Sequence, residues 1–113
     1  MAAIGFVVPV QPGKEQADLD WMEEMQGARS DAYAESWRQL GVKRHTVWHQ
    51  ETPDGTVAVV YMEADDVAAA MQAIAASDDP FNKWFRDRVQ DVHGIDLTSD
   101  SPPQSQQIHD AGF

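Results

Sequence analysis

The chain has 113 residues, 42% of them hydrophobic, which is the size and composition of one domain with its own core. It has no cysteine, and this excludes a disulfide framework, a thiolate zinc site, an iron–sulfur cluster and a cysteine nucleophile. Its formal charge of −11 disfavours binding to nucleic acid or to an anionic membrane surface.

The first ten residues, MAAIGFVVPV, predict an edge strand over residues 3–10. They are rich in valine and end at the turn Gln11-Pro12-Gly13, and Pro9 suits an edge position or a bulge. The apolar run has no basic segment before it and is far too short to span a bilayer. We therefore expect a cytoplasmic protein.

A long amphipathic helix is predicted from Glu15 to Leu40, stopped by Gly41. Gly27 leaves open whether this helix is interrupted. The apolar residues that recur mostly at every third or fourth position are Leu19, Met22, Met25, Tyr33, Trp37 and Leu40.

A hairpin is the most strongly signalled element, because two β-rich segments, 43–51 and 56–63, flank the turn sequence Thr-Pro-Asp-Gly. A three-residue loop would place Thr52 opposite Thr56 and His45 opposite Glu63. Alternation then gives two faces. One carries His45, Val47, His49, Val59, Tyr61 and Glu63, and the other carries Thr46, Trp48, Gln50, Ala58, Val60 and Met62.

Two further helices follow the hairpin. Asp65 or Asp66 can cap a helix that runs to Ala76. Asp79-Pro80 supplies the N-cap and first-turn proline of the next helix, which ends at Gly94.

The end of the chain predicts a short fourth strand and a tail. Residues 95–98 have a strand-like composition, and the following SDSPPQSQQ has that of a linker. The sequence thus divides into a domain over 1–98 and a linker and tail over 99–113. Ile108 and Phe113 are candidates to dock the tail on this subunit or on its partner.

The order strand, helix, strand, strand, helix, strand predicts an α+β fold, the ferredoxin-like βαββαβ sandwich, with a four-stranded antiparallel sheet and helices on one face. The helices of such a small domain leave the second face of the sheet uncovered. Face-to-face association with a copy buries it, so we predict a homodimer.

Four stretches resemble the dimeric α/β-barrel superfamily, which includes rhamnose mutarotases, small aromatic-polyketide cyclases and quinol-type monooxygenases. They are residues 40–42 (LGV), residues 44–49 (RHTVWH), residues 60–66 (VYMEADD) and residues 81–85 (FNKWF). The resemblance covers nearly the whole chain and is nearest to the mutarotases and the cyclases. It implies a dimeric α/β barrel and transfers no catalytic residue.

His45 and His49 are four residues apart, a spacing that would suit a metal on a helix. In a strand they lie about 13 Å apart along the axis, too far to share one ion. We predict no metal and no cofactor.

The same histidines suit acid/base chemistry. A carboxylate beside an imidazole raises its pKa and fixes its tautomer. The predicted catalytic set is therefore His45 or His49 as proton carrier, Glu63 as the carboxylate, and Tyr61 as donor to a substrate oxygen. An ordinary charge pair between strands is the alternative.

Large apolar side chains are candidates to bind a flat or ring-shaped ligand, with core packing as the alternative. They are Trp48, Trp84, Phe6 and Met62. Asn82 and Arg86 could reach a pocket mouth or lie on a solvated helix face. The sequence has no Gly-rich phosphate loop and no Gly-x-Ser-x-Gly motif.

Together these features predict a homodimeric, cofactor-independent isomerase or cyclase that acts on a small organic molecule by proton transfer in a mostly apolar pocket. One alternative is a cofactor-free monooxygenase of the same fold, which would consume oxygen with its substrate. The other is a ligand-binding or structural dimer without turnover.

Overall fold

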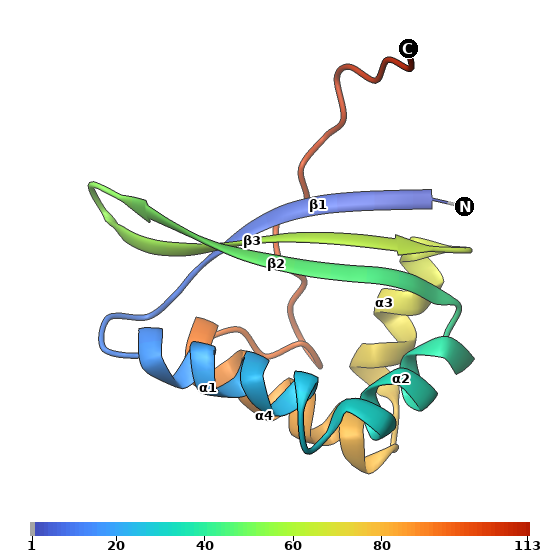
Figure 1. Ribbon diagram of the computed structural model, residues 1–113, viewed down its shortest axis with the longest axis horizontal. Coiled ribbons are helices and arrows are strands. Elements are labelled where there is room, and N and C mark those ends of the chain that lie inside the picture. Colours follow the sequence, from blue (N-terminus) through green and yellow to red (C-terminus); the bar gives the residue numbers. More distant parts are fainter. Residues whose placement is uncertain (1) are drawn as a thin grey trace.

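The computed structural model describes residues 2–113 as a three-stranded antiparallel sheet with four helices packed on one of its faces (Figure 1). The strand order is β1-β3-β2, so β3 is central. The α+β class and the one-sided helical layer are as predicted. The elements are β1 (Ala2–Pro9), α1 (Glu15–Gln26), α2 (Ser30–Gln39), β2 (Val42–Thr52), β3 (Gly55–Ala64), α3 (Val67–Ala76) and α4 (Pro80–His93).

The predicted fourth strand over residues 95–98 is wrong, and with it the four-stranded ferredoxin-like sandwich. Asp96 is the reason, because its carboxylate accepts hydrogen bonds from the Thr98 amide at 3.0 Å and from the Thr98 hydroxyl at 2.6 Å. Local bonds of this kind stabilise a turn at the expense of an extended strand.

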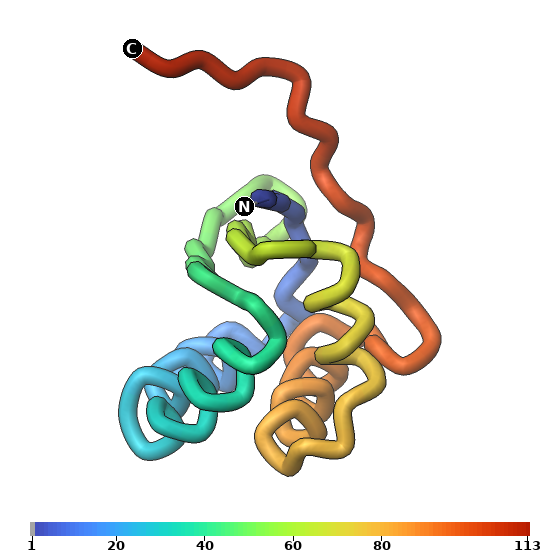
Figure 2. Tube along the Cα trace, turned by 90° about the vertical axis from the view of Figure 1, so that its right-hand side faces the viewer, coloured from blue at the N-terminus to red at the C-terminus, as the bar shows by residue number. Residues whose placement is uncertain are grey.

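The tail meets the free edge of β1 instead. The Ser105 amide donates to the Gly5 carbonyl at 2.8 Å, and one isolated bridge joins Gln104 to Phe6. Beyond this contact the tail leaves the edge of the sheet and extends away from the domain (Figure 2), with Ile108 90% exposed. Docking of Ile108 and Phe113 on this subunit is therefore absent, and docking on a partner stays a prediction.

The hairpin forms where predicted, but its loop is one residue shorter. Thr52 pairs with Gly55, not with Thr56. The Thr52 hydroxyl donates to the Gly55 carbonyl at 2.8 Å and accepts from the Asp54 amide at 3.2 Å, and Gly55 has φ +124°, where a side chain would be strained.

This shift moves every residue of β3 by one position against β2, so the predicted faces are wrong. His45 lies opposite Met62, and Glu63 lies opposite Arg44. The inner face, toward the helices, carries Ile4, Phe6, Val8, His45, Val47, His49, Ala58, Val60 and Met62. The outer face carries Val7, Thr46, Trp48, Gln50, Val57, Val59, Tyr61 and Glu63.

The single long helix over 15–40 is also wrong, because the chain breaks at Gly27 into α1 and α2. The Gly27 and Arg29 amides both donate to the Glu24 carbonyl, at 3.3 and 2.9 Å, which ends α1. The turn lets α2 change direction while Met25 and Trp37 both stay buried, at 3% exposed.

The two later helices begin as predicted. The Asp66 carboxylate accepts from the Ala69 amide, and the Asp79 carboxylate accepts from the Phe81 amide, both at 3.0 Å. Gly94 ends α4 with φ +71°. Within residues 2–113, none of the four helices is long and apolar enough to cross a membrane.

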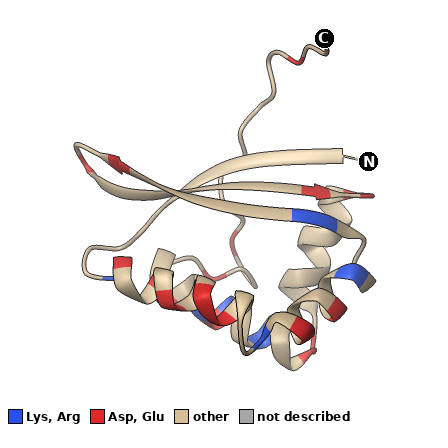
Figure 3. Ribbon diagram, viewed as in Figure 1, with Lys and Arg blue, Asp and Glu red and all other residues tan. Residues whose placement is uncertain are grey.

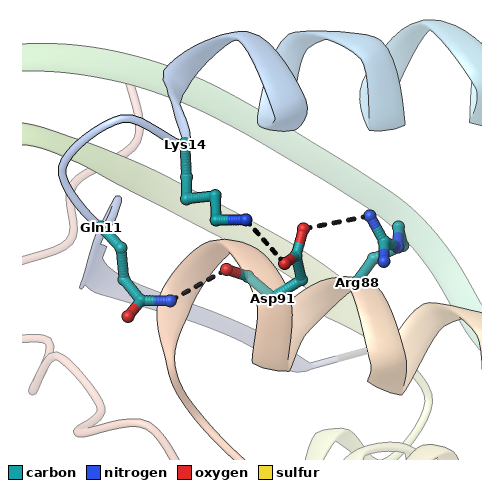
Figure 4. A network of polar contacts seen from close by, with 4 residues as sticks. All are labelled: Gln11, Lys14, Arg88 and Asp91. Carbon is teal, nitrogen blue, oxygen red and sulfur yellow. Dashed lines mark hydrogen bonds and ion pairs between the residues drawn. The ribbon is translucent and has the colours of Figure 1, made fainter.

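A polar network fixes the end of α4 to the turn before α1 (Figure 4). Asp91 accepts from Lys14 at 2.9 Å and from Arg88 at 3.2 Å. The Gln11 side chain donates to the Asp91 carbonyl, and its backbone amide donates to the Val92 carbonyl, both at 2.9 Å. His93 follows Val92 at the end of α4, so the same network holds His93 against the inner face of the sheet.

Candidate functional site

A cavity of about 260 Å³ lies between the inner face of the sheet and the helices. Its walls are mostly apolar and include the rings of Trp21, Trp37 and Phe85. Ser101 and Gln104 of the tail line one side of the cavity, and both residues are exposed. A concave apolar space with few polar groups is the usual form of a small-molecule site.

The structure brings two of the four proposed binding residues to this cavity. Phe6 and Met62 line it. Trp48 lies on the outer face and is 53% exposed. Trp84 lies on α4 away from the cavity, where the Arg29 guanidinium stacks 4.1 Å from the centre of its ring.

His45 is the proposed catalytic residue that lines the cavity. Its Nδ1 atom is 2.6 Å from the hydroxyl of Tyr33, and its ring centre lies 4.7 Å from that of Trp37. Burial lowers the pKa of His45 to about 4 and raises the pKa of Tyr33 to about 12. Both groups are therefore uncharged at neutral pH.

Stability should depend on pH through His45. Between about pH 6.5 and pH 4 the unfolded chain binds a proton at this imidazole that the folded chain does not, so stability falls as the pH falls through that window. The contribution is on the order of 3 kcal/mol. Urea unfolding at pH 7 and pH 4.5 should show a smaller loss for His45→Gln than for the unchanged protein. Equal losses would mean that the imidazole is solvated.

Tyr33 was missed as a site residue, because its position in an apolar helical stripe predicted only packing. Its hydroxyl reaches His45 from α2, twelve residues earlier in the chain. The one usable signal is that a tyrosine in a core stripe needs a polar partner for its hydroxyl.

The other proposed catalytic residues do not join His45. Tyr61 and Glu63 lie on the outer face, across the sheet from both histidines. His49 shares the inner face with His45 but lies outside the cavity lining. Its Nε2 atom is 2.5 Å from a carboxylate oxygen of Asp18 on α1. The predicted pair of His45 and Glu63 is therefore wrong, and the imidazole–carboxylate pair of the structure joins His49 to Asp18.

Asp18 is fully buried, with 0% of its surface exposed. One of its oxygens binds His49, and the other has no hydrogen-bond partner among residues 2–113. A buried carboxylate with one bond depends heavily on that bond. His49 therefore has a clear structural role.

His93, at the end of α4, also lines the cavity. Its Nδ1 atom is 2.7 Å from the carbonyl oxygen of Pro9. Burial lowers its pKa, against the smaller opposing effects of the Pro9 carbonyl and the Asp18 charge. Sequence reasoning gave His93 no role, because no local pattern shows what a residue at a helix end faces.

Within the described chain, residues 2–113, no three His, Asp or Glu side chains are grouped as a metal site would require. No protein-family model matches the sequence, and no curated protein is significantly similar to it. The resemblance to the dimeric α/β-barrel superfamily stays a prediction that rests on the residues given for it.

Proposed function

We propose that the chain is a cytoplasmic, homodimeric, cofactor-independent enzyme of the dimeric α/β-barrel type that isomerises or cyclises a small uncharged organic molecule by proton transfer. The observation that carries the proposal is the uncharged imidazole of His45 on the wall of an apolar cavity, paired through Nδ1 with the Tyr33 hydroxyl. A neutral imidazole in such surroundings can donate a hydrogen bond to a carbonyl oxygen.

The direction of the Tyr33 bond sets the role of His45. Tyr33 keeps its proton at neutral pH, since its pKa is raised to about 12, and we assign its hydroxyl as the donor to Nδ1 of His45. The ring proton of His45 then sits on Nε2 and is available to a substrate. In an isomerisation or ring closure, a water molecule takes the proton from the carbon next to the carbonyl, and Nε2–H donates a hydrogen bond to the oxygen as its charge grows. The water then returns a proton to the product, so His45 keeps its own proton throughout.

Charge and size restrict the substrate. Acidic residues are spread over the helical layer (Figure 3), and Asp100 is the one charged side chain on the cavity wall within residues 2–113. No lysine or arginine of that part of the chain lines the cavity, so an anionic substrate would have no counter-ion. A volume of about 260 Å³ suits a molecule of one or two rings.

The dimer in this proposal is supported by the outer face of the sheet. No helix covers that face (Figure 1), and it exposes 48% of Val7 and 53% of Trp48. Ile108 and Phe113 of the tail are also exposed. A second copy placed face to face would bury these side chains.

Solvent-deuterium exchange tests the proposed chemistry without knowledge of the natural substrate. In D₂O, the protein should accelerate loss of the protons next to the carbonyl of 6-hydroxy-1-tetralone, followed by proton NMR. His45→Gln should slow this exchange about 100-fold, the scale of a lost hydrogen-bond donor to the developing oxyanion. Its melting temperature at pH 7 should change little.

His109→Gln, in the exposed tail, is the matched control and should exchange at the unchanged rate. Exchange no faster than in buffer, or equal rates for His45→Gln and the unchanged protein, would overturn the proposal. Uptake of oxygen with the probe would instead favour a cofactor-free monooxygenase on the same cavity.

A further inference from the structure

The two imidazoles on the cavity wall have opposite hydrogen-bonding polarity. The Pro9 carbonyl can only accept, so Nδ1 of His93 carries the ring proton and donates across the 2.7 Å contact. Nε2 of neutral His93 then holds a lone pair and is an acceptor. His45 is the reverse in the bond direction assigned above, in which Tyr33 donates to Nδ1 and Nε2 carries the proton.

The two groups lie at opposite ends of the inner face. His45 is opposite Met62 on β3, whereas Pro9, which holds His93, is opposite Val57. These β3 positions are five residues apart, about 16 Å of strand. The aromatic wall between the imidazoles is continuous, with ring centres 4.9 Å apart for Trp37 and Phe85 and 5.2 Å apart for Phe85 and Trp21.

The acceptor at the His93 end is held firmly. Trp21 packs against the ring, with centres 6.0 Å apart, and the network of Gln11, Lys14 and Asp91 in Figure 4 secures the end of α4. A preorganised acceptor loses little entropy when a ligand donates to it. A ligand without a donor would leave it unpaired.

We propose that the cavity takes an elongated, uncharged, ring-containing molecule with a carbonyl oxygen at the His45 end and a hydroxyl donor at the His93 end. His93 is then a specificity-determining residue that binds the hydroxyl through Nε2. This inference rests on the proposed function for the position of the reacting carbonyl. It adds the second anchor and the substrate class.

Binding of a matched pair of probes tests the second anchor. 4-(4-Hydroxyphenyl)cyclohexanone and 4-(4-methoxyphenyl)cyclohexanone share the carbonyl and an elongated two-ring skeleton, but only the first has a hydroxyl donor. Calorimetry should give at least about tenfold tighter binding of the hydroxy compound, since a buried acceptor would otherwise lose its hydrogen bond. His93→Phe should bring the two dissociation constants together.

Two further variants separate the possible outcomes. His93→Gln offers an amide oxygen as acceptor and should restore part of the preference. His45→Gln should weaken both probes by the same factor and keep their ratio, because it acts on the shared carbonyl. An equal affinity of the two probes for the unchanged protein, or a ratio that survives His93→Phe, would overturn the inference.

The imidazole ¹⁵N spectrum of the unchanged protein covers the case in which His93→Phe fails to fold. The Nε2 resonance of His93 should shift with the hydroxy probe and stay in place with the methoxy probe, and the opposite result counts against the inference. Binding preference and deuterium exchange are independent readouts. A protein that prefers the hydroxyl but does not exchange protons would contradict the proposed function alone.

Discussion

Replacing His49 by leucine is expected to lower the free energy of unfolding by about 3 kcal/mol at pH 7. The substitution removes the one hydrogen bond of the Asp18 carboxylate, whose surface is 0% exposed and whose second oxygen already lacks a partner within residues 2–113. Leaving a buried carboxylate without its partner lowers the stability more than replacing both partners by apolar side chains does. Urea denaturation followed by circular dichroism gives the change.

Substitution of the partner residue, Asp18, and substitution of both residues together serve as controls. Asp18→Leu should cost less, because the His49 side chain is 24% exposed and can be solvated. The double variant His49→Leu/Asp18→Leu should recover most of the loss, since apolar side chains replace both partners. A loss below about 1 kcal/mol for His49→Leu would show that water reaches Asp18.

Asn82→Ala is expected to cost a similar amount, about 3 kcal/mol. Asn82 is 1% exposed, and its side-chain oxygen accepts from the Trp37 indole at 2.9 Å. Its amide nitrogen donates to the hydroxyls of Ser36 and Ser77 at 3.0 and 3.1 Å. Alanine leaves the indole N–H and both hydroxyls without this partner and opens a void between α2 and α4.

Ser36→Ala is the matched control, because it removes one of the three bonds and should cost about 1 kcal/mol. The near-ultraviolet circular dichroism of Asn82→Ala should also change, since Trp37 loses its fixed orientation on the cavity wall. Thermal unfolding of the Asn82→Ala and Ser36→Ala variants measures the stability that each of them loses. Equal costs for Asn82→Ala and Ser36→Ala would mean that the bonds of Asn82 to Trp37 and Ser77 contribute nothing.

The helix positions of Asn82 and Arg86 did not predict which groups their side chains contact. Both were candidates for a pocket mouth or a solvated face, and neither lines the cavity. Arg86 donates to the Ile74 and Ser77 carbonyls at 2.8 Å and satisfies the end of α3. Periodicity places a residue on a face of its helix, but the partner that this face meets is decided by packing between elements.

The sequence alone determined the parts of the fold that depend on neighbouring residues. The capping aspartates Asp66 and Asp79 set the starts of α3 and α4, and Pro53-Asp54 with Gly55 set the hairpin. These signals act within about four residues, where side chain and backbone meet whatever the rest of the chain does.

The tertiary structure alone decided the composition of the candidate site. One residue of loop length moved Tyr61 and Glu63 to the face away from His45, because side chains alternate along a strand. The pairs Tyr33–His45, Asp18–His49 and Pro9–His93 join residues 12, 31 and 84 positions apart. Such contacts arise only when helices pack on the sheet, and no local pattern encodes which polar groups then meet.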